Sequence, residues 1–246
     1  MNCLRSAKYI KKIDARYKKY DLETIIIHPP EWEFEKESAN ISANLKQNNI
    51  PFPFIPDQDR KRINELGVNF WPTQLLVKDG KVLYKHIGEG NYKKLEEQII
   101  QILQIKNKNI KKIFTKEPVY SKYPTVYCGT RKNGVVIQPK DINKTALQFG
   151  NIYTQGEWQQ EPEFLRSTAD NESLTITTKG KIINFVAESL SKKPIKVSVL
   201  LNDTLSKNII VNKQRLYKLM ELKTNAPQKL ILKTQKDLAV YSFSFE

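Results

Sequence analysis

Apolar residues recur every three or four positions at the start of the chain, with lysine and arginine between them. This spacing is typical of an amphipathic helix and predicts one over 3–20. A β-branched run, LETIII at 22–27, stops at the sequence HPP and therefore predicts a short buried strand. The apolar stripe of the helix consists of Leu4, Ala7, Ile10, Ile13 and Tyr17.

The next stretch predicts two short helices separated by an extended segment. Ser38, a residue type that caps helices, precedes a helical pattern through Ile41 and Leu45. The sequence PFPFI at 51–55 predicts the extended segment. DQDRKRINELGV then predicts a helix that ends at Gly67, because glycine is favoured just after a helix C-terminus.

The segment 73–90, TQLLVKDGKVLYKHIGEG, has the pattern of a β-hairpin. Its two apolar runs meet at Asp79 and Gly80, the dipeptide that type I′ turns favour. Another amphipathic helix follows, and a lysine- and asparagine-rich stretch at 106–117 interrupts its pattern. The apolar face of this helix consists of Leu95, Ile99, Ile100, Leu103 and Ile105.

Short alternating apolar runs, separated by breaks that contain glycine, asparagine or aspartate, fill the chain beyond residue 118. Their spacing is typical of an antiparallel β-sandwich. In the last run three aromatic residues alternate with two serines, so we expect a strand with one buried and one exposed face. The aromatic residues are Tyr241, Phe243 and Phe245, and the serines are Ser242 and Ser244.

The length of 246 residues favours two domains, since single domains cluster at about 100–150 residues. We expect an α/β domain over 1–105, a linker over 106–117, and an all-β domain of the jelly-roll or β-sandwich type over 118–246. No run of about 18 apolar residues exists, so the sequence predicts neither a membrane span nor a signal peptide.

The net charge of +15 raises the question of nucleic-acid binding. The excess is mostly lysine, whereas base and phosphate recognition favours arginine. The densest run, KNKNIKKIFTK at 106–116, contains one aromatic residue and favours a solvated linker face. We therefore expect no nucleic-acid partner. Two cysteines and the isolated His28 and His86 provide no metal-ligand spacing, so no metal site is predicted.

Several stretches resemble a known family. The predicted order of elements in the first half is that of a thioredoxin-like fold whose first strand is absent. NCLR at the start of a helix, HPPEWEFEKESAN at 28–40, NFWPTQLLVKDGKVLYKHIGEG at 69–90, QRLYKLMEL and LAVYSFSF together resemble the soluble part of the DipZ/TlpA-like proteins. That family joins a thioredoxin-like redox domain to a β-sandwich that resembles a carbohydrate-binding module, outside the cytoplasmic membrane.

The resemblance implies thiol–disulfide oxidoreductase activity, with protein dithiols and disulfides as partners and no organic cofactor or metal. In the family the motif reads Cys-x-Asn-Cys-Leu-Arg, and residues 2–5 match its last four places. Cys3 is then the resolving cysteine, and the attacking cysteine would precede Met1. We therefore expect a chain cut at its N-terminus, with impaired activity, and membrane contact only through an upstream segment. Pro72, next to Trp71, matches the family's cis-proline.

The remaining candidates have two interpretations each. Cys3 lies at a helix N-terminus, which favours a thiolate, yet a lone thiol is often inert. Glu31, Trp32 and Phe34 line the substrate side of the redox site, or Trp32 and Phe34 only pack their loop. Trp158, near Tyr153, forms a platform for a sugar ring or belongs to a core. The alternative function is a non-catalytic module that binds carbohydrate or an envelope protein.

Cys128 and Pro72 also have ordinary structural interpretations. Cys128, in YCGTR, fits a small buried apolar residue better than a partner for Cys3. Pro72 could be an edge proline, but its place after Trp71 and before a strand favours the cis-proline role.

Overall fold

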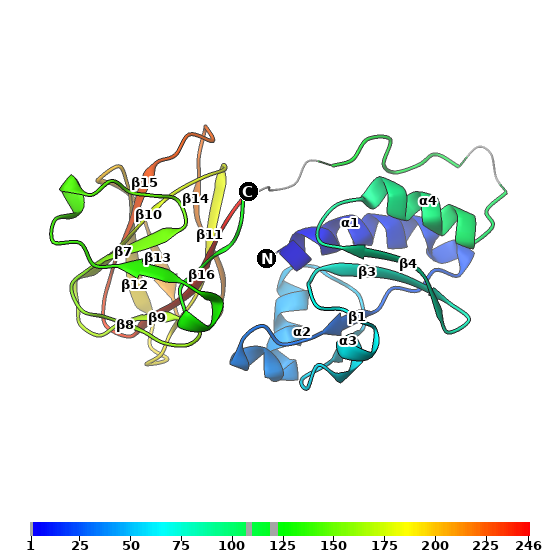
Figure 1. Cartoon of the computed structure of the whole chain (residues 1–246), viewed down its shortest axis with the longest axis horizontal. Coiled ribbons are helices and arrows are strands. Elements are labelled where there is room, and N and C mark those ends of the chain that lie inside the picture. The colour runs from blue at the N-terminus through cyan, green and yellow to red at the C-terminus, as the bar shows by residue number, and fades with distance from the viewer. Residues whose placement is uncertain (1, 107–109, 119–122) are drawn as a thin grey trace. The chain divides into compact units, whose positions relative to one another are not determined.

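A computed structural model describes residues 2–106, 110–118 and 123–246 (Figure 1). The chain divides into two compact units, Met1–Tyr120 and Ser121–Glu246. We call them the first and second unit. Residues 107–109 of the predicted linker lie outside the described residues. The predicted domain bounds stay a prediction, and the segment 110–117 packs on the first unit as described below.

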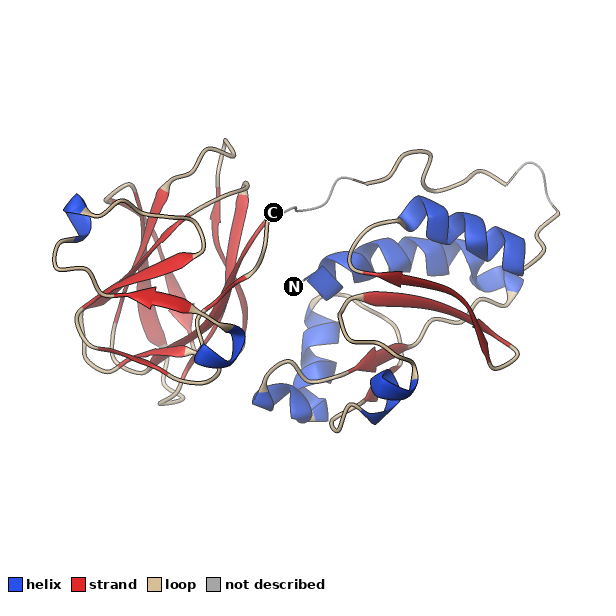
Figure 2. Cartoon of the chain, viewed as in Figure 1, coloured by secondary structure: helices blue, strands red, loops and turns tan. Residues whose placement is uncertain are grey.

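The first unit contains four α-helices and four short strands among its described residues (Figure 2). In chain order the elements are α1 (Asn2–Tyr17), η1 (Lys18–Tyr20), β1 (Ile26–His28), η2 (Glu33–Lys36), α2 (Ser38–Gln47), β2 (Phe54–Pro56), α3 (Lys61–Glu65), β3 (Thr73–Lys78), β4 (Lys81–Ile87) and α4 (Tyr92–Ile102).

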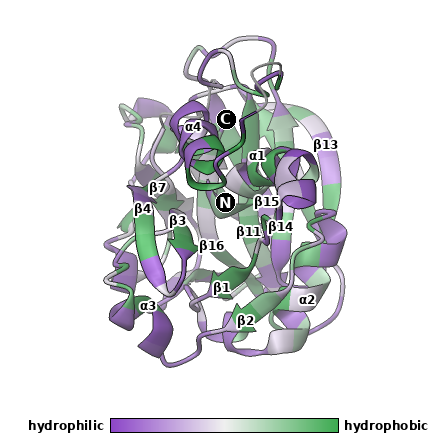
Figure 3. Cartoon of the chain, turned by 90° about the vertical axis from the view of Figure 1, so that its right-hand side faces the viewer, coloured by the Kyte–Doolittle hydropathy of each residue, from purple (hydrophilic) through white to green (hydrophobic). Residues whose placement is uncertain are grey.

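The described strands of the first unit form two separate sheets. β1 pairs in parallel with β2, and β3 pairs antiparallel with β4. Asp79 and Gly80 join β3 to β4 with φ angles of 51° and 72°, so the predicted hairpin and its type I′ turn are confirmed. In Figures 1 and 3, β3 is the strand of the hairpin that lies toward β1.

Two local predictions need correction. The strand predicted over 22–27 is restricted to Ile26–His28, because its partner β2 is only three residues long, and Ile25 is 55% exposed. Ser38 is the first residue of α2, not its cap, and Glu37 occupies the cap position without a side-chain hydrogen bond. Gly67 follows α3 with a φ angle of 59°, as the prediction of a helix end there requires.

α1 is the central helix of the first unit because both of its apolar flanks are covered. Ile13 and Tyr17 pack in a cluster with α4 and the hairpin. Leu4 and Ala7 pack against a second cluster, which comes from α2 and the segment before β2. Ile10 contacts both clusters, so α1 joins the two parts of the unit.

The second unit is a sandwich of two six-stranded sheets, which confirms the predicted all-β domain. One sheet has the order β13-β12-β15-β10-β7-β6, and the other has the order β14-β11-β16-β9-β8, with β5 paired to β16. The strands are β5 (Val126–Tyr127), β6 (Val135–Ile137), β7 (Asn151–Gln155), β8 (Trp158–Gln160), β9 (Leu165–Ser167), β10 (Glu172–Thr177), β11 (Ile182–Ser189), β12 (Ile195–Leu201), β13 (Thr204–Val211), β14 (Arg215–Glu221), β15 (Lys229–Thr234) and β16 (Leu238–Phe245).

The last strand, β16, departs from the predicted alternation. Its pairing with β11 skips Tyr241, because Val186 pairs with Ser242 while Ala187 pairs with Val240. This bulge turns Tyr241 out of the core that Phe243 joins. All eight residues of β16 are buried, so the expectation of one exposed face was wrong; the strand is central, with neighbours on both edges.

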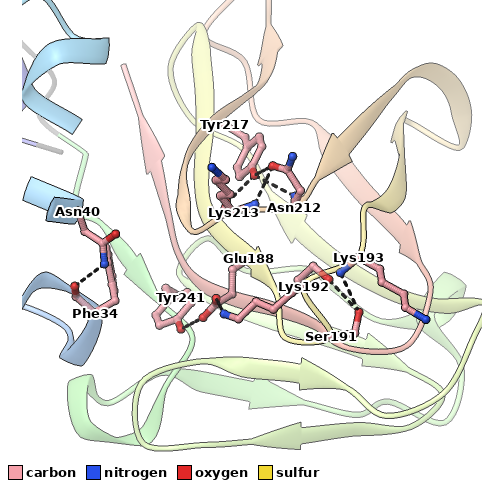
Figure 4. A network of polar contacts seen from close by, with 11 residues as sticks. Phe34, Asn40, Glu188, Ser191, Lys192, Lys193, Asn212, Lys213, Tyr217 and Tyr241 are labelled. Carbon is pink, nitrogen blue, oxygen red and sulfur yellow. Dashed lines mark hydrogen bonds and ion pairs between the residues drawn. The ribbon is translucent and has the colours of Figure 1, made fainter. Parts of the chain in front are cut away.

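A polar network replaces core packing at this bulge (Figure 4). The hydroxyl of Tyr241 donates to Glu188 at 2.6 Å, and Lys192 pairs with the other oxygen of the same carboxylate at 3.1 Å. Burial raises the pKa of Tyr241, and the bond to Glu188 acts in the same direction. The buried phenol is therefore a donor that satisfies a buried carboxylate.

Candidate functional site

Cys3 lies in the first turn of α1 and is exposed. Another residue of the motif, Arg5, holds Asn2 and Glu89 in place through its guanidinium group. Arg5 donates from Nη2 to the side-chain oxygen of Asn2 at 2.8 Å and to Oε2 of Glu89 at 2.9 Å. Its Nε lies 3.0 Å from Oε1 of Glu89. This two-pronged ion pair ties the start of α1 to the loop after β4.

A second contact joins α1 to the strand that follows the candidate proline. The side-chain nitrogen Nε2 of Gln74 lies 3.5 Å from the hydroxyl oxygen of Ser6 and 3.4 Å from the backbone carbonyl oxygen of Gly90. Ser6 stands one helical turn after Cys3, and Gln74 stands two residues after Pro72. The start of α1 and the start of β3 therefore lie at the same end of the first unit.

The peptide bond between Trp71 and Pro72 is cis, the isomer that the resemblance implies. The carbonyl of Pro72 accepts the N–H of Gly88 at 2.8 Å, which joins the two ends of the hairpin. The Arg60 guanidinium lies 5.5 Å from the Trp71 ring centroid and donates to the carbonyl of Pro30 at 2.8 Å. Arg60 thus connects the proline segment to the loop that carries Glu31.

The loop between β1 and α2 is organised around the carboxylate of Glu35. One of its oxygens accepts the backbone N–H of Glu31 at 2.6 Å and that of Trp32 at 3.3 Å. Burial, together with the charge of Glu31, raises the pKa of Glu35 to about 7, although the two N–H groups act in the opposite direction. Trp32 is 6% exposed and stacks on Phe34, with ring centroids 5.8 Å apart, as the packing interpretation expects.

Acidic residues of this loop act on the candidate thiol. Desolvation raises the pKa of Cys3, although its side chain is exposed, and the charges of Glu31 and Glu35 raise it further. These effects oppose the thiolate that a helix N-terminus favours.

The candidates in the second unit lie in or against its core. Tyr153 is 2% exposed, and Trp158 is half-buried, with its indole N–H donating to the carbonyl of Gln155 at 3.2 Å. Cys128 is fully buried, and burial raises its pKa well above the usual range. Within the described part of the chain, no group of three or more His, Cys, Asp or Glu side chains could hold a metal ion.

Three residues that organise the site received no role from the sequence. Arg60 adopts a left-handed backbone conformation with a φ of 59°, and no local pattern places it beside Trp71. Gln74 and Glu89 both lie within the hairpin stretch that resembles the family. Arg5, the arginine of the motif, was the one signal in the sequence that a carboxylate partner such as Glu89 was needed.

Comparison with known proteins supports the assignment of both units. Residues 126–245 match the family model described as "Thioredoxin like C-terminal domain". The thiol-disulfide oxidoreductase ResA of Bacillus cereus is 31% identical over 101 residues, which are 41% of this chain and 56% of ResA. DipZ of Mycobacterium tuberculosis is 28% identical over 104 residues, which are 42% of this chain and 15% of DipZ.

The chain is a thioredoxin-like protein related to DipZ and ResA. Its second unit is a β-sandwich, and residues 126–245 of it match that C-terminal domain. The chain matches only a small part of DipZ and little more than half of ResA, so the activity of those whole proteins does not transfer directly.

Solved structures resemble this thioredoxin-like protein only weakly. A putative thiol:disulfide interchange protein DsbE from Chlorobium tepidum has a TM-score of 0.38 at 24% identity, over 42% of this chain and 71% of that one. The carbohydrate-binding module CBM36 has a TM-score of 0.31 at 10% identity, over 39% of this chain and 94% of that one. The strand order described above, not these scores, establishes the sandwich. No described helix is long and apolar enough to cross a membrane.

Proposed function

We propose that this thioredoxin-like protein takes part in thiol–disulfide exchange through Cys3, and that the 246-residue chain does not complete a catalytic cycle. The observation that carries the proposal is the position of Cys3, the only cysteine in the sequence of the first unit. It is exposed at the start of α1, in the part of the unit where Gln74 ties that helix to the strand after Pro72.

The chemistry requires two sulfur atoms. In the resolving role, the Cys3 thiolate attacks a mixed disulfide between another cysteine and a substrate. A new S–S bond forms to Cys3, and the substrate sulfur leaves as a thiolate that takes a proton. A lone Cys3 can instead attack a substrate disulfide: a mixed disulfide forms with one substrate sulfur, the original S–S bond breaks, and the other sulfur leaves as a thiolate that takes a proton. Cys128 is 0% exposed, so it does not supply the second thiol.

The surrounding residues have positioning roles in this proposal. The backbone at Trp71 and Pro72 aligns the peptide that carries the reacting sulfur. The charge of Glu31 raises the pKa of the Cys3 thiol, and Trp32 holds the same loop through its stack on Phe34. From the resemblance to the DipZ/TlpA-like family we also propose that the protein acts outside the cytoplasmic membrane, which fractionation of the source cell would test.

Two assays on the full chain test the proposal. With glutathione disulfide, we expect one glutathione per chain, attached to Cys3 and lost in Cys3→Ser but retained in Cys128→Ser. In an insulin-reduction assay with excess dithiothreitol, we expect no rate above the reductant alone. Turnover that Cys3→Ser abolishes would contradict the single-thiol argument, and failure to form the adduct would contradict the role of Cys3.

A carbohydrate-binding role for the second unit is the alternative. The observation that favours it is that Trp158 stays half-exposed on β8, the edge strand of its sheet. If this role is correct, a panel of soluble polysaccharides should retard the chain in affinity electrophoresis, and Trp158→Ala should remove the retardation. Equal mobility with every polysaccharide would leave thiol exchange as the function.

A further inference from the structure

One flank of α1 carries a stripe of basic side chains. Lys8, Lys12 and Arg16 follow one another at steps of four, which places them on the same side of α1. Lys19 continues the spacing in η1, directly after that helix, and all four are exposed. Residues 2–20 contain seven basic residues and a single acidic one, Asp14. Polar colour marks the outer turns of α1 in Figure 3.

The segment 110–117, which we call the strap, lies beside this stripe. It returns along α4 in Figure 1, and its Phe114 is 5% exposed. The Phe114 ring lies 6.1 Å from the ring of Tyr9, and the ammonium group of Lys12 lies 5.6 Å from the same Tyr9 ring. The strap therefore borders the basic stripe, although about 100 residues separate them in sequence.

Two carboxylates, one buried and one exposed, fasten the strap to α4. Glu96 is fully buried and accepts the N–H groups of Ile113 at 2.7 Å and Phe114 at 2.9 Å. Glu117 accepts the first backbone N–H groups of α4, those of Tyr92 at 2.9 Å and Lys93 at 3.1 Å.

The lysines of the strap remain outward. Lys111, Lys112 and Lys116 are exposed, and one of them, Lys112, pairs with Glu97 at 3.3 Å. Glu96 is fully buried, and the three exposed lysines of the strap outnumber its one exposed carboxylate, that of Glu117. We call the set of seven side chains the basic face: Lys8, Lys12, Arg16, Lys19, Lys111, Lys112 and Lys116.

We propose that the basic face binds the surface of a membrane that contains anionic phospholipids. Clusters of four to eight lysine or arginine residues on an amphipathic helix are attracted to acidic lipid headgroups. Among the described residues, none of the large exposed apolar side chains lies on α1, α4 or the strap. The contact is therefore electrostatic and reversible, without insertion into the bilayer, and it is separate from any attachment through an upstream segment.

The composition of the face favours lipid over nucleic acid. Six of its seven cations are lysines, which act as point charges, whereas base reading uses arginine, asparagine or glutamine in fixed geometries. The aromatic rings next to the face, those of Tyr9, Tyr20 and Phe114, pack against the core cluster of α1 and α4 and so offer little surface for base stacking.

Flotation of the full chain with lipid vesicles tests the proposal. We expect binding to vesicles of phosphatidylcholine mixed with phosphatidylglycerol at low salt, and none to phosphatidylcholine alone. Binding should vanish at about 1 M salt, where the Debye length falls to about 3 Å. The variant K8Q/K12Q/R16Q/K19Q should bind at least about tenfold more weakly, since each removed cation weakens the attraction to the lipid.

The control variant carries the same change in net charge on the second unit, at four exposed lysines. It is K193Q/K213Q/K223Q/K236Q. We expect its vesicle binding to stay within about threefold of the wild type, because these lysines lie off the basic face. Equal loss in both variants would show that only overall charge matters and would overturn the proposal. So would absent vesicle binding, or preferential capture of duplex DNA when vesicles and DNA compete.

Discussion

Arg5 and Glu89 are 84 positions apart in the chain and form a two-pronged ion pair whose side chains are only 11% and 5% exposed. Their contact closes the loop after β4 onto the first turn of α1, next to Cys3. A buried pair of this kind is costly to break from one side, because the remaining charge loses its partner without regaining water.

Replacing Glu89 with glutamine should therefore destabilise the first unit. We expect a loss of about 2–4 kcal/mol in the free energy of unfolding, since the Arg5 guanidinium stays buried without a counter-charge. Urea unfolding followed by tryptophan emission measures it. The matched control is Glu97→Gln, which removes the half-exposed pair with Lys112 and should cost no more than about 0.5 kcal/mol. Equal effects of both changes would contradict a structural role for the Arg5 pair.

Local features of the first unit were predictable, and long-range pairings were not. α1 follows from its own apolar stripe, and the hairpin follows from Asp79 and Gly80, because both signals lie within a few residues. The Arg5–Glu89 pair joins residues 84 positions apart, and no periodicity connects them. The bulge at Tyr241 was also missed, because a bulge is a property of pairing between strands.

The residues of the candidate site also divide into those that the sequence predicted and those that it did not. Cys3 and Pro72 came from the resemblance, because a short motif can identify residues whose contacts are unknown. Arg60 was not predicted, because its contacts to Trp71 and Pro30 depend on how α3 packs near the loop. The run 106–116 was interpreted as a solvated linker since lysine dominates it. One buried ring, Phe114, fastens its described part to α1 and α4.

The strap should be part of the stable first unit. We expect Phe114→Ala to lower the free energy of unfolding by about 3 kcal/mol, because it leaves a cavity beside Tyr9 and Tyr92. Glu96→Gln should also destabilise, since this carboxylate accepts the hydroxyl of Tyr17 at 2.7 Å as well as the strap N–H groups.

Limited proteolysis gives a second measure of the strap. The two substitutions should speed cleavage within 110–117, whereas Lys111→Ala, at an exposed position, should leave both stability and the cleavage rate near those of the wild type. Early cleavage of the wild type at Phe114 would show that the strap is not fastened.

The hairpin should promote self-association. Val77 and Val82 face each other across β3 and β4, and they are 58% and 44% exposed. β3 also presents an edge that pairs with no other described strand, and exposed apolar edges favour association. We expect concentration-dependent association by sedimentation velocity, reduced in V77K/V82K. The comparison variant L205K/I210K changes two similarly exposed residues of β13. If only this variant lost association, the contact would lie on the second unit.

Alkylation of Cys3 should be slow at neutral pH and should depend on the acidic loop. Because the pKa of Cys3 is raised, little thiolate exists near pH 7, and the rate with iodoacetamide should keep rising beyond pH 9. Glu31→Gln removes a charge that opposes ionisation of the thiol, so we expect faster reaction, by about threefold to tenfold.

Glu35→Gln adds a pH signature to the same experiment. The pKa of Glu35 is about 7, so below pH 7 this carboxyl is mostly protonated and its replacement should change little. Above pH 7 the wild type carries the opposing charge and the variant does not, so the variant should react faster only there. Glu33→Gln is the control from the same loop, because Glu33 pairs with Lys36 at the surface and is not among the charges that raise the Cys3 pKa. If Glu35→Gln had an effect of equal size at pH 6 and pH 9, loop structure and not charge would govern the reaction rate of the thiol. Every variant also carries Cys128→Ser, which restricts the labelling to Cys3.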